Sequence, residues 1–242
     1  MSFRGKLGYL VVPFIAVGCT SGVYYRSPDA GDGGLTPKDS STPSDSGTKD
    51  TSVQPGIDAG NCNGSGLTGC TPQSTCGFSP AGLKPNTYAP GACTSQDVAA
   101  FYTACINPGD STACQNLSSS KPNCTSCLLT QGSASTAGAV VEGNGLVTAN
   151  IAGCFKVKGN TTCANAVESH SQCTKTACEE VCPVSDNTSF TTYQKCLTDS
   201  DATNCKSYAS AATSCDQDTS CTGSDFQGTY TLIANLFCVT GK

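Results

Sequence analysis

The chain carries few residues of the kinds that perform acid–base chemistry. His170 is its only histidine. Imidazole is the commonest general base, so a secreted hydrolase with a Ser–His–Asp arrangement around His170 is one candidate. However, the chain has no G-x-S-x-G motif to mark a nucleophile. His170 lies in the polar stretch VESHSQ on a predicted helix. We therefore expect a solvated surface histidine and predict that the protein is not an enzyme.

A second candidate for chemistry is the C-x-x-C motif of Cys124 and Cys127. In a thioredoxin-like protein this motif is a redox-active dithiol, but it then stands in a βαβ context that the sequence here lacks. The corresponding pairs later in the chain, which end at Cys178 and Cys221, are more widely spaced. This pattern favours structural cysteines with different partners. Zinc would need thiolates kept reduced, so we predict no metal and no other cofactor.

Cysteine content is the most informative property of the composition. The chain has 19 cysteines, and setting Cys19 aside leaves 18, an even number that can all pair. This density is that of a disulfide scaffold. We predict an oxidising compartment and 18 bonded cysteines, although spacing alone does not reveal the pairing. They are Cys62, Cys70, Cys76, Cys93, Cys105, Cys114, Cys124, Cys127, Cys154, Cys163, Cys173, Cys178, Cys182, Cys196, Cys205, Cys215, Cys221 and Cys238.

The first residues have the pattern of a secretory signal. Arg4 and Lys6 precede an almost wholly apolar run over residues 7–16. A basic segment followed by an apolar run of about ten residues is typical of an exported chain. The run is shorter than the roughly 20 apolar residues that a membrane-spanning helix needs. We therefore expect export with removal of this segment.

The end of the apolar run resembles the lipobox of bacterial lipoproteins. Ala16, Val17 and Gly18 precede Cys19, although the family prefers leucine where Ala16 stands. The resemblance implies cleavage after Gly18, a diacylglycerol on Cys19 and, because Thr20 follows, sorting to the outer membrane. The alternative is an ordinary signal peptide cut near Gly18, with Cys19 as a spare thiol. The lipobox together with the cysteine content resembles the Cys-rich lipoproteins of bacterial surfaces, a resemblance that implies no functional residues beyond Cys19.

Composition divides the chain into three parts. Residues 1–18 are the predicted lipoprotein signal peptide, and residues 19–61 are rich in Ser, Asp, Gly and Pro. Such a segment buries too little apolar surface to offset its ordering entropy, so we predict a disordered tether. About 40 flexible residues span roughly 35 Å. Residues 62–242 form the predicted Cys-rich domain.

The cysteine spacing predicts internal repeats within that domain. The motif C-x8-C-x9-C occurs three times, beginning at Cys105, Cys154 and Cys196. Most segments around these motifs have helical periodicity, so we predict a mainly α, disulfide-rich helical repeat domain. The stretch TSQDVAAFYTAC has one apolar face and a capping box of Thr94 and Asp97.

Three further segments are predicted as regular structure. SDFQGTYTLIANLFC has a second apolar helical face, for which we predict a capping box of Ser224 and Gln227. TTCANAVESHSQC and ATNCKSYASAATSC are alanine-rich and predict helices. Residues 138–149 instead favour a small β-hairpin, because Gly-Asn-Gly separates two β-branched runs. A helix over this last stretch is the alternative.

These features favour a lipid-anchored protein of the bacterial cell envelope, with the outer membrane as the expected location. Removal of Arg4 and Lys6 with the signal lowers the formal net charge from −5 to −7, which disfavours nucleic-acid partners. We predict a structural or binding module whose partners are the membrane, through Cys19, and a protein or envelope polymer of unknown identity. A carrier of an apolar ligand is the alternative.

Overall fold

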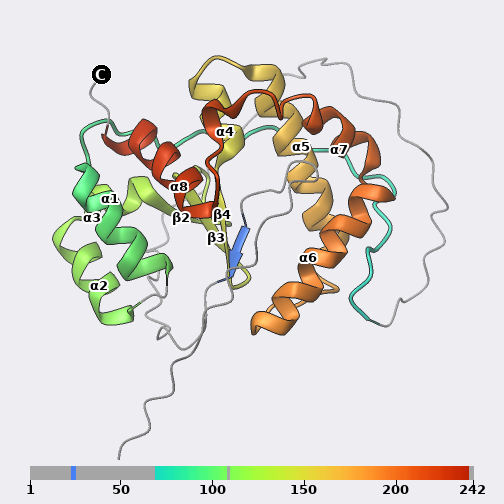
Figure 1. Cartoon of the computed structure of the whole chain (residues 1–242), viewed down its shortest axis with the longest axis horizontal. Coiled ribbons are helices and arrows are strands. Elements are labelled where there is room, and N and C mark those ends of the chain that lie inside the picture. Colours follow the sequence, from blue (N-terminus) through green and yellow to red (C-terminus); the bar gives the residue numbers. More distant parts are fainter. Residues whose placement is uncertain (1–22, 26–68, 108–109, 240–242) are drawn as a thin grey trace, which may run out of the picture.

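The computed structural model describes residues 23–25, 69–107 and 110–239. These residues contain eight α-helices and four short strands, so the chain is helix-rich with a small sheet, as predicted (Figure 1). In chain order the elements are β1 (Val23–Tyr25), α1 (Ser95–Phe101), η1 (Tyr102–Ile106), α2 (Ser111–Ser120), α3 (Pro122–Leu128), β2 (Leu129–Gln131), β3 (Val140–Gly143), β4 (Leu146–Ala149), α4 (Ile151–Val157), α5 (Thr161–Cys178), α6 (Asn187–Ala202), α7 (Lys206–Thr213), η2 (Thr219–Cys221), α8 (Phe226–Ala234) and η3 (Asn235–Val239).

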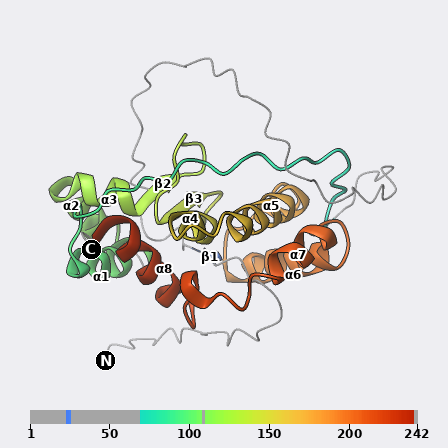
Figure 2. The same ribbon diagram turned by 90° about the horizontal axis from the view of Figure 1, so that it is seen from above.

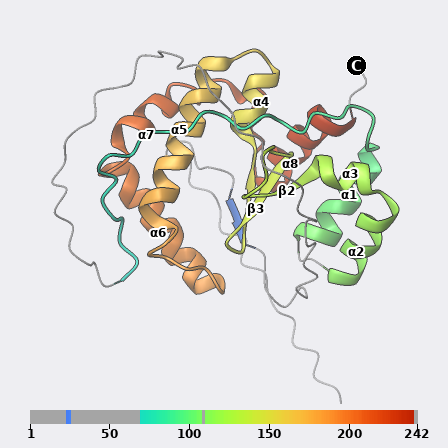
Figure 3. The same cartoon turned by 180° about the vertical axis from the view of Figure 1, so that it is seen from behind.

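The helices form two lobes on either side of the sheet, as Figures 1 and 3 show from opposite sides. The first lobe contains α1, η1, α2, α3, α8 and η3, and α1 contacts both α3 and α8. The second lobe contains α5, α6 and α7, with α5 in contact with the other two helices. Helix α4 contacts α5 and α8 and therefore bridges the lobes.

The predicted hairpin is confirmed. Strands β3 and β4 pair antiparallel, with Gly143 opposite Leu146, so Asn144 and Gly145 alone form the turn. Their φ angles are 53° and 74°, which is the left-handed backbone that a two-residue type I′ turn requires. Asparagine and glycine adopt this conformation at low energetic cost, so the local sequence selects the hairpin over the alternative helix.

The sheet has the order β1-β4-β3-β2, with β2 parallel to β3. Strand β1 pairs antiparallel with β4, placing Val23 opposite Thr148. Three residues of the segment predicted as a disordered tether therefore form a strand. The prediction missed β1 because composition averaged over residues 19–61 hides a Val-Tyr-Tyr run of high β-propensity. The other residues of that segment, and its boundary at residue 61, lie outside the described residues.

The predicted capping box at the start of the first lobe is confirmed. The Thr94 side chain accepts from the backbone N–H of Asp97, and the Asp97 carboxylate accepts from the N–H of Thr94. The predicted apolar face of this helix is buried and consists of Val98, Phe101, Tyr102 and Cys105. Pro122 stands in the first turn of α3, where it separates α3 from α2.

The predicted cap of the last helix is wrong by one residue. Asp225, and not Ser224, caps α8, and its carboxylate accepts from the backbone N–H of Gly228 at 2.7 Å. An aspartate at this position offers a charged acceptor to the helix N-terminus, and this outweighs the neutral serine one residue earlier. The predicted apolar face is buried, and it consists of Phe226, Tyr230, Ile233 and Phe237.

An extended segment, residues 69–92, runs along both lobes and is called the strap below (Figure 2). In the second lobe, the Asn204 side-chain amide donates to the carbonyl of Gln73 at 2.7 Å. In the first lobe, the N–H of Ala89 donates to the carbonyl of Phe237 at 3.0 Å. The strap thus binds helices that are far apart in the sequence.

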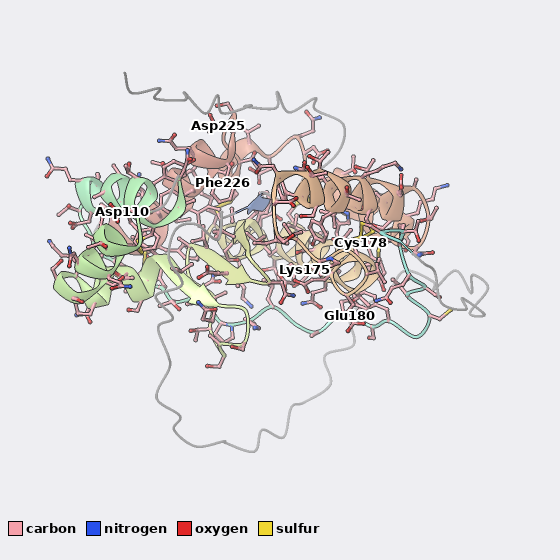
Figure 4. All side chains as sticks on the ribbon, turned by 90° about the horizontal axis from the view of Figure 1, so that it is seen from below. Asp110, Lys175, Cys178, Glu180, Asp225 and Phe226 are labelled. Atoms are coloured by element: carbon pink, nitrogen blue, oxygen red, sulfur yellow. A yellow bond between two sulfur atoms is a disulfide. The ribbon has the colours of Figure 1, made fainter. Side chains whose placement is uncertain are left out.

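Two hydrophobic cores lie in the molecule. The aromatic core includes Phe101, Phe155, Tyr230, Ile233 and Phe237 and joins the first lobe to α4 and the sheet. The cystine core joins the second lobe to strand β4, and its buried members are Leu146, Cys173, Ala177, Cys178, Cys182, Tyr193, Cys196 and Cys205. Figure 4 labels one residue of each core, Phe226 on α8 and Cys178 on α5, in opposite halves of the molecule.

Candidate functional site

Disulfides are the dominant chemical feature of the described residues, all 17 of whose cysteines are disulfide-bonded. Eight bonds join Cys70–Cys182, Cys93–Cys124, Cys105–Cys114, Cys127–Cys238, Cys154–Cys221, Cys163–Cys215, Cys173–Cys205 and Cys178–Cys196. Cys76 is also disulfide-bonded. Cys19 and Cys62 lie outside the described residues. The chain is therefore a disulfide-rich protein, as the composition predicts.

Four of the disulfides form a nested ladder along α4 and α5. They are Cys154–Cys221, Cys163–Cys215, Cys173–Cys205 and Cys178–Cys196. Cysteines that come later in the segment over α4 and α5 bond to cysteines that come earlier in the segment from α6 to η2. The two segments therefore run antiparallel to each other. The loops that these bonds close shorten from 67 to 18 residues of sequence separation. The four bonds of the ladder therefore cross-link the two antiparallel segments along their whole length.

The three copies of C-x8-C-x9-C are not equivalent, so the structure does not confirm a repeat. In the first copy the first two cysteines bond to each other. In contrast, the last two cysteines of the second copy bond to the last two of the third. The copies share only local structure, since each C-x8-C interval spans a break between two helices. The regular spacing of the cysteines therefore indicates where helices end, but it does not predict how those helices pack.

The C-x-x-C motif is not a dithiol in this structure. Cys124 bonds to Cys93, and Cys127 bonds to Cys238. Each cysteine of the motif thus connects α3 to a different part of the first lobe.

A cluster of three sulfur atoms was not anticipated from the sequence. The Sγ atoms of Cys70, Cys182 and Cys196 all lie within 4.8 Å of one another. Cys70 and Cys182 share one disulfide, and Cys196 belongs to the neighbouring bond with Cys178. These sulfurs carry no thiolate in the oxidised protein, so the cluster does not present metal ligands in this state. The cluster depends on the packing of α6 against the end of α5, for which spacing offers no signal.

The predicted surface position of His170 is wrong. The residue is 5% exposed, and its Nε2 lies 2.6 Å from Oδ1 of Asp201. The side chain of Asp201, which is on α6, remains partly exposed. Polar sequence neighbours do not make this position a solvated one, because α5 packs against α6 here. The contact between His170 and Asp201 connects α5 to α6, two helices of the cystine core. The neighbouring hydroxyl of Ser200 donates to the carbonyl of Leu197. This hydrogen bond lies within the last turns of α6.

A shallow groove lies on the outer face of the first lobe. Its walls come from α1, η1 and α2, and its volume is about 550 Å³. The lining consists of Ala99, Ala100, Thr103, Ala104, Asp110 and Ala113. Alanine side chains offer little apolar surface, and the groove is open to solvent.

Burial and local hydrogen bonds perturb the ionisable groups of the two lobes. Burial raises the pKa of Tyr193 and that of Tyr230, whose hydroxyl donates to the carbonyl of Val98 at 3.0 Å. The backbone N–H and side chain of Thr94 lower the pKa of Asp97. These shifts follow from packing and helix capping.

None of the helices in the described part of the chain has both the length and the apolar character needed to cross a bilayer.

Comparison with known proteins finds no matching family model, no similar curated protein and no similar solved structure.

Proposed function

We propose that the protein is a lipid-anchored, non-enzymatic component of the bacterial cell envelope whose disulfide-bonded domain is a structural or binding module. The observation that carries the proposal is that all 17 described cysteines are disulfide-bonded. Disulfides at this density persist in oxidising compartments such as the periplasm and the cell surface. Export agrees with the basic and apolar segments at the start of the sequence. The anchor itself rests on residues 16–19, through their resemblance to a lipobox.

Strand β1 limits the distance at which such an anchor would hold the domain from the membrane. Val23 pairs with Thr148 and is four residues beyond Cys19. Four residues of extended chain span at most about 14 Å. A lipid on Cys19 would therefore hold the sheet close to the membrane, in place of the roughly 35 Å that a free 40-residue tether allows.

Metabolic labelling tests the anchor. The full chain would be expressed in a bacterial host supplied with an alkyne fatty acid, beside a Cys19→Ser variant. We expect the wild-type protein to carry the label and an intact mass that begins at an acylated Cys19, and the variant to lose both. A wild-type protein with an unmodified N-terminus would contradict the proposal.

The short connection to the membrane has its own test. Replacement of Val23, Tyr24 and Tyr25 by glycine removes the β-propensity of β1, and we expect the domain to move tens of ångströms from a supported bilayer. The same replacement at residues 51–53 is the matched control and is expected to leave the height unchanged. Neutron reflectometry measures that height. Equal heights in the two variants would show that β1 does not set the distance.

The groove on the first lobe is the observation that favours the alternative, a carrier of an apolar ligand. Ligand sites bury most of their ligand's surface, and an open groove lined by alanine would leave an acyl chain largely in water. We therefore expect no saturable binding of a fluorescent fatty acid. Saturable binding that Ala100→Glu abolishes would establish the carrier function.

A further inference from the structure

We propose that Cys70, Cys182, Cys196 and Cys178 form a thiol–disulfide exchange site that takes an external thiol or dithiol and breaks the covalent tie between the strap and the second lobe. Nothing in this reaction requires the lipid anchor. In the sulfur cluster, a third sulfur lies next to a disulfide to which it does not belong.

The geometry favours exchange between the two neighbouring disulfides. The Sγ atom of Cys196 lies within 4.8 Å of both sulfurs of the Cys70–Cys182 bond. Cys182, Cys196 and Cys178 are buried, whereas Cys70 is half-buried on the strap. An external thiol would therefore reach Cys70 first, and the sulfur that it displaces would be enclosed beside Cys196.

The exchange proceeds in two balanced steps. An external thiolate attacks the Sγ of Cys70, forms a mixed disulfide there and expels Cys182 as a thiolate. The Cys182 thiolate then attacks the Sγ of Cys196, forms the Cys182–Cys196 bond and expels Cys178, which takes up a proton. The number of disulfides is unchanged, because two internal bonds become one internal and one mixed bond.

An external dithiol completes the reaction. Its second sulfur attacks the first at the mixed disulfide, which releases Cys70 as a thiolate and leaves the reagent as its own disulfide. Two electrons have then passed from the dithiol to the protein. Cys70 and Cys178 are thiols, and Cys182–Cys196 is the remaining internal bond.

The product keeps the cross-link of the second lobe while the strap loses its disulfide to that lobe. Before exchange, Cys178–Cys196 joins the end of α5 to α6. After exchange, Cys182–Cys196 makes the same connection from four residues further along. The strap loses the covalent tie of Cys70 to Cys182 and keeps its non-covalent contacts, including the edge-to-face packing of Phe78 on Tyr208 and the hydrogen bond from the Gln73 N–H to the carbonyl of Ala177. Exchange thus leaves the strap without a covalent tie to the end of α5, while the cross-link between α5 and α6 remains.

A single substitution tests the exchange without a reductant. In the full-length Cys70→Ser variant, the Cys182 thiol is left beside Cys196. We expect alkylation after acid quenching and denaturation to label both Cys182 and Cys178, with a Cys182–Cys196 peptide in the non-reduced digest. The matched control is Cys105→Ser, which leaves Cys114 outside any three-sulfur group among the described residues. In that variant we expect label on Cys114 alone.

A double substitution keeps the test decisive if the single variant folds poorly. The Cys70→Ser/Cys178→Ser protein retains only Cys182 and Cys196 from the site. We expect these two to form a disulfide, with no free thiol and a wild-type helical circular dichroism spectrum. Two free thiols in the double variant, or label on Cys182 alone in the single variant, would overturn the proposal.

Discussion

The aromatic core and the cystine core stabilise their surroundings in different ways. The aromatic core buries large side chains, among them Phe101, Phe155 and Phe237. Five of the eight buried residues of the cystine core are cysteines, and its only buried aromatic residue is Tyr193. Full burial of a large apolar side chain contributes about 1.5–3 kcal/mol, and a disulfide that closes a loop of about 15 residues contributes roughly 3 kcal/mol. Within one chain, cross-links can therefore replace apolar volume as a source of stability.

The largest expected effect comes from reduction. We expect full reduction to abolish amide hydrogen-exchange protection throughout α5, α6 and α7, because the cystine core has little apolar burial without its disulfides. Amides of α1, α8 and the hairpin should keep measurable protection, because the aromatic core remains. Hydrogen exchange with peptide resolution measures both regions in one sample. Simultaneous loss of protection in both would show that the cores are not separable.

Truncation of a core side chain is the next largest effect. Phe101 is fully buried and stacks near Tyr230, so Phe101→Ala should lower the free energy of unfolding by about 3–5 kcal/mol. Leu146→Ala in the cystine core should cost about 2 kcal/mol, at the lower end of the range for such changes, because disulfides hold the site. Urea unfolding of the oxidised protein measures both. The control is Tyr88→Ala, at a side chain that is 52% exposed. A larger loss for Leu146→Ala than for Phe101→Ala would reverse the comparison.

Alkaline pH should affect one tyrosine in each core. In the unfolded chain tyrosine ionises near pH 10, whereas burial raises the pKa of Tyr193 and Tyr230 in the folded state. Unfolding therefore releases protons at high pH, and stability that is present below about pH 10 falls as the pH rises above it. Either substitution, Tyr193→Phe or Tyr230→Phe, should reduce the fall in unfolding free energy between about pH 8 and about pH 11. An unchanged fall in both variants would exclude these tyrosines as its cause.

The smallest expected effect is at the helix cap of the first lobe. Thr94→Ala removes the capping box and should lower stability by about 1 kcal/mol. The substitution removes the Thr94 hydroxyl that donates to the Asp97 carboxylate and helps to lower its pKa, whereas the backbone N–H of residue 94 remains as a donor. The contribution of that hydroxyl bond is present above the ordinary aspartate pKa of about 3.9 and is lost as the pH falls through the lowered pKa of the folded state. The difference between wild-type and variant stabilities, measured by urea unfolding, should therefore become smaller in acid. A constant difference down to about pH 2 would contradict this account.

Much of the local structure is predictable from the sequence. The Asn144-Gly145 turn and the Thr94–Asp97 cap depend on residues within a few positions of one another, and the structure confirms both. The cap of α8 was misplaced by one residue because Ser224 and Asp225 are both good capping residues, and the choice between them depends on how the helix starts. The high cysteine content likewise predicts an oxidised protein without any knowledge of packing.

The helices, the hairpin and the oxidised cysteines follow from the sequence alone, because hydrogen bonds, turn conformations and apolar periodicity act over short stretches of chain. In contrast, the pairing of Cys173 with Cys205, the burial of His170 against Asp201 and the place of Val23 in the sheet depend on tertiary packing. The partners in these contacts are 31 residues or more apart. Such contacts form only when whole elements pack together, and no local pattern encodes which elements do so.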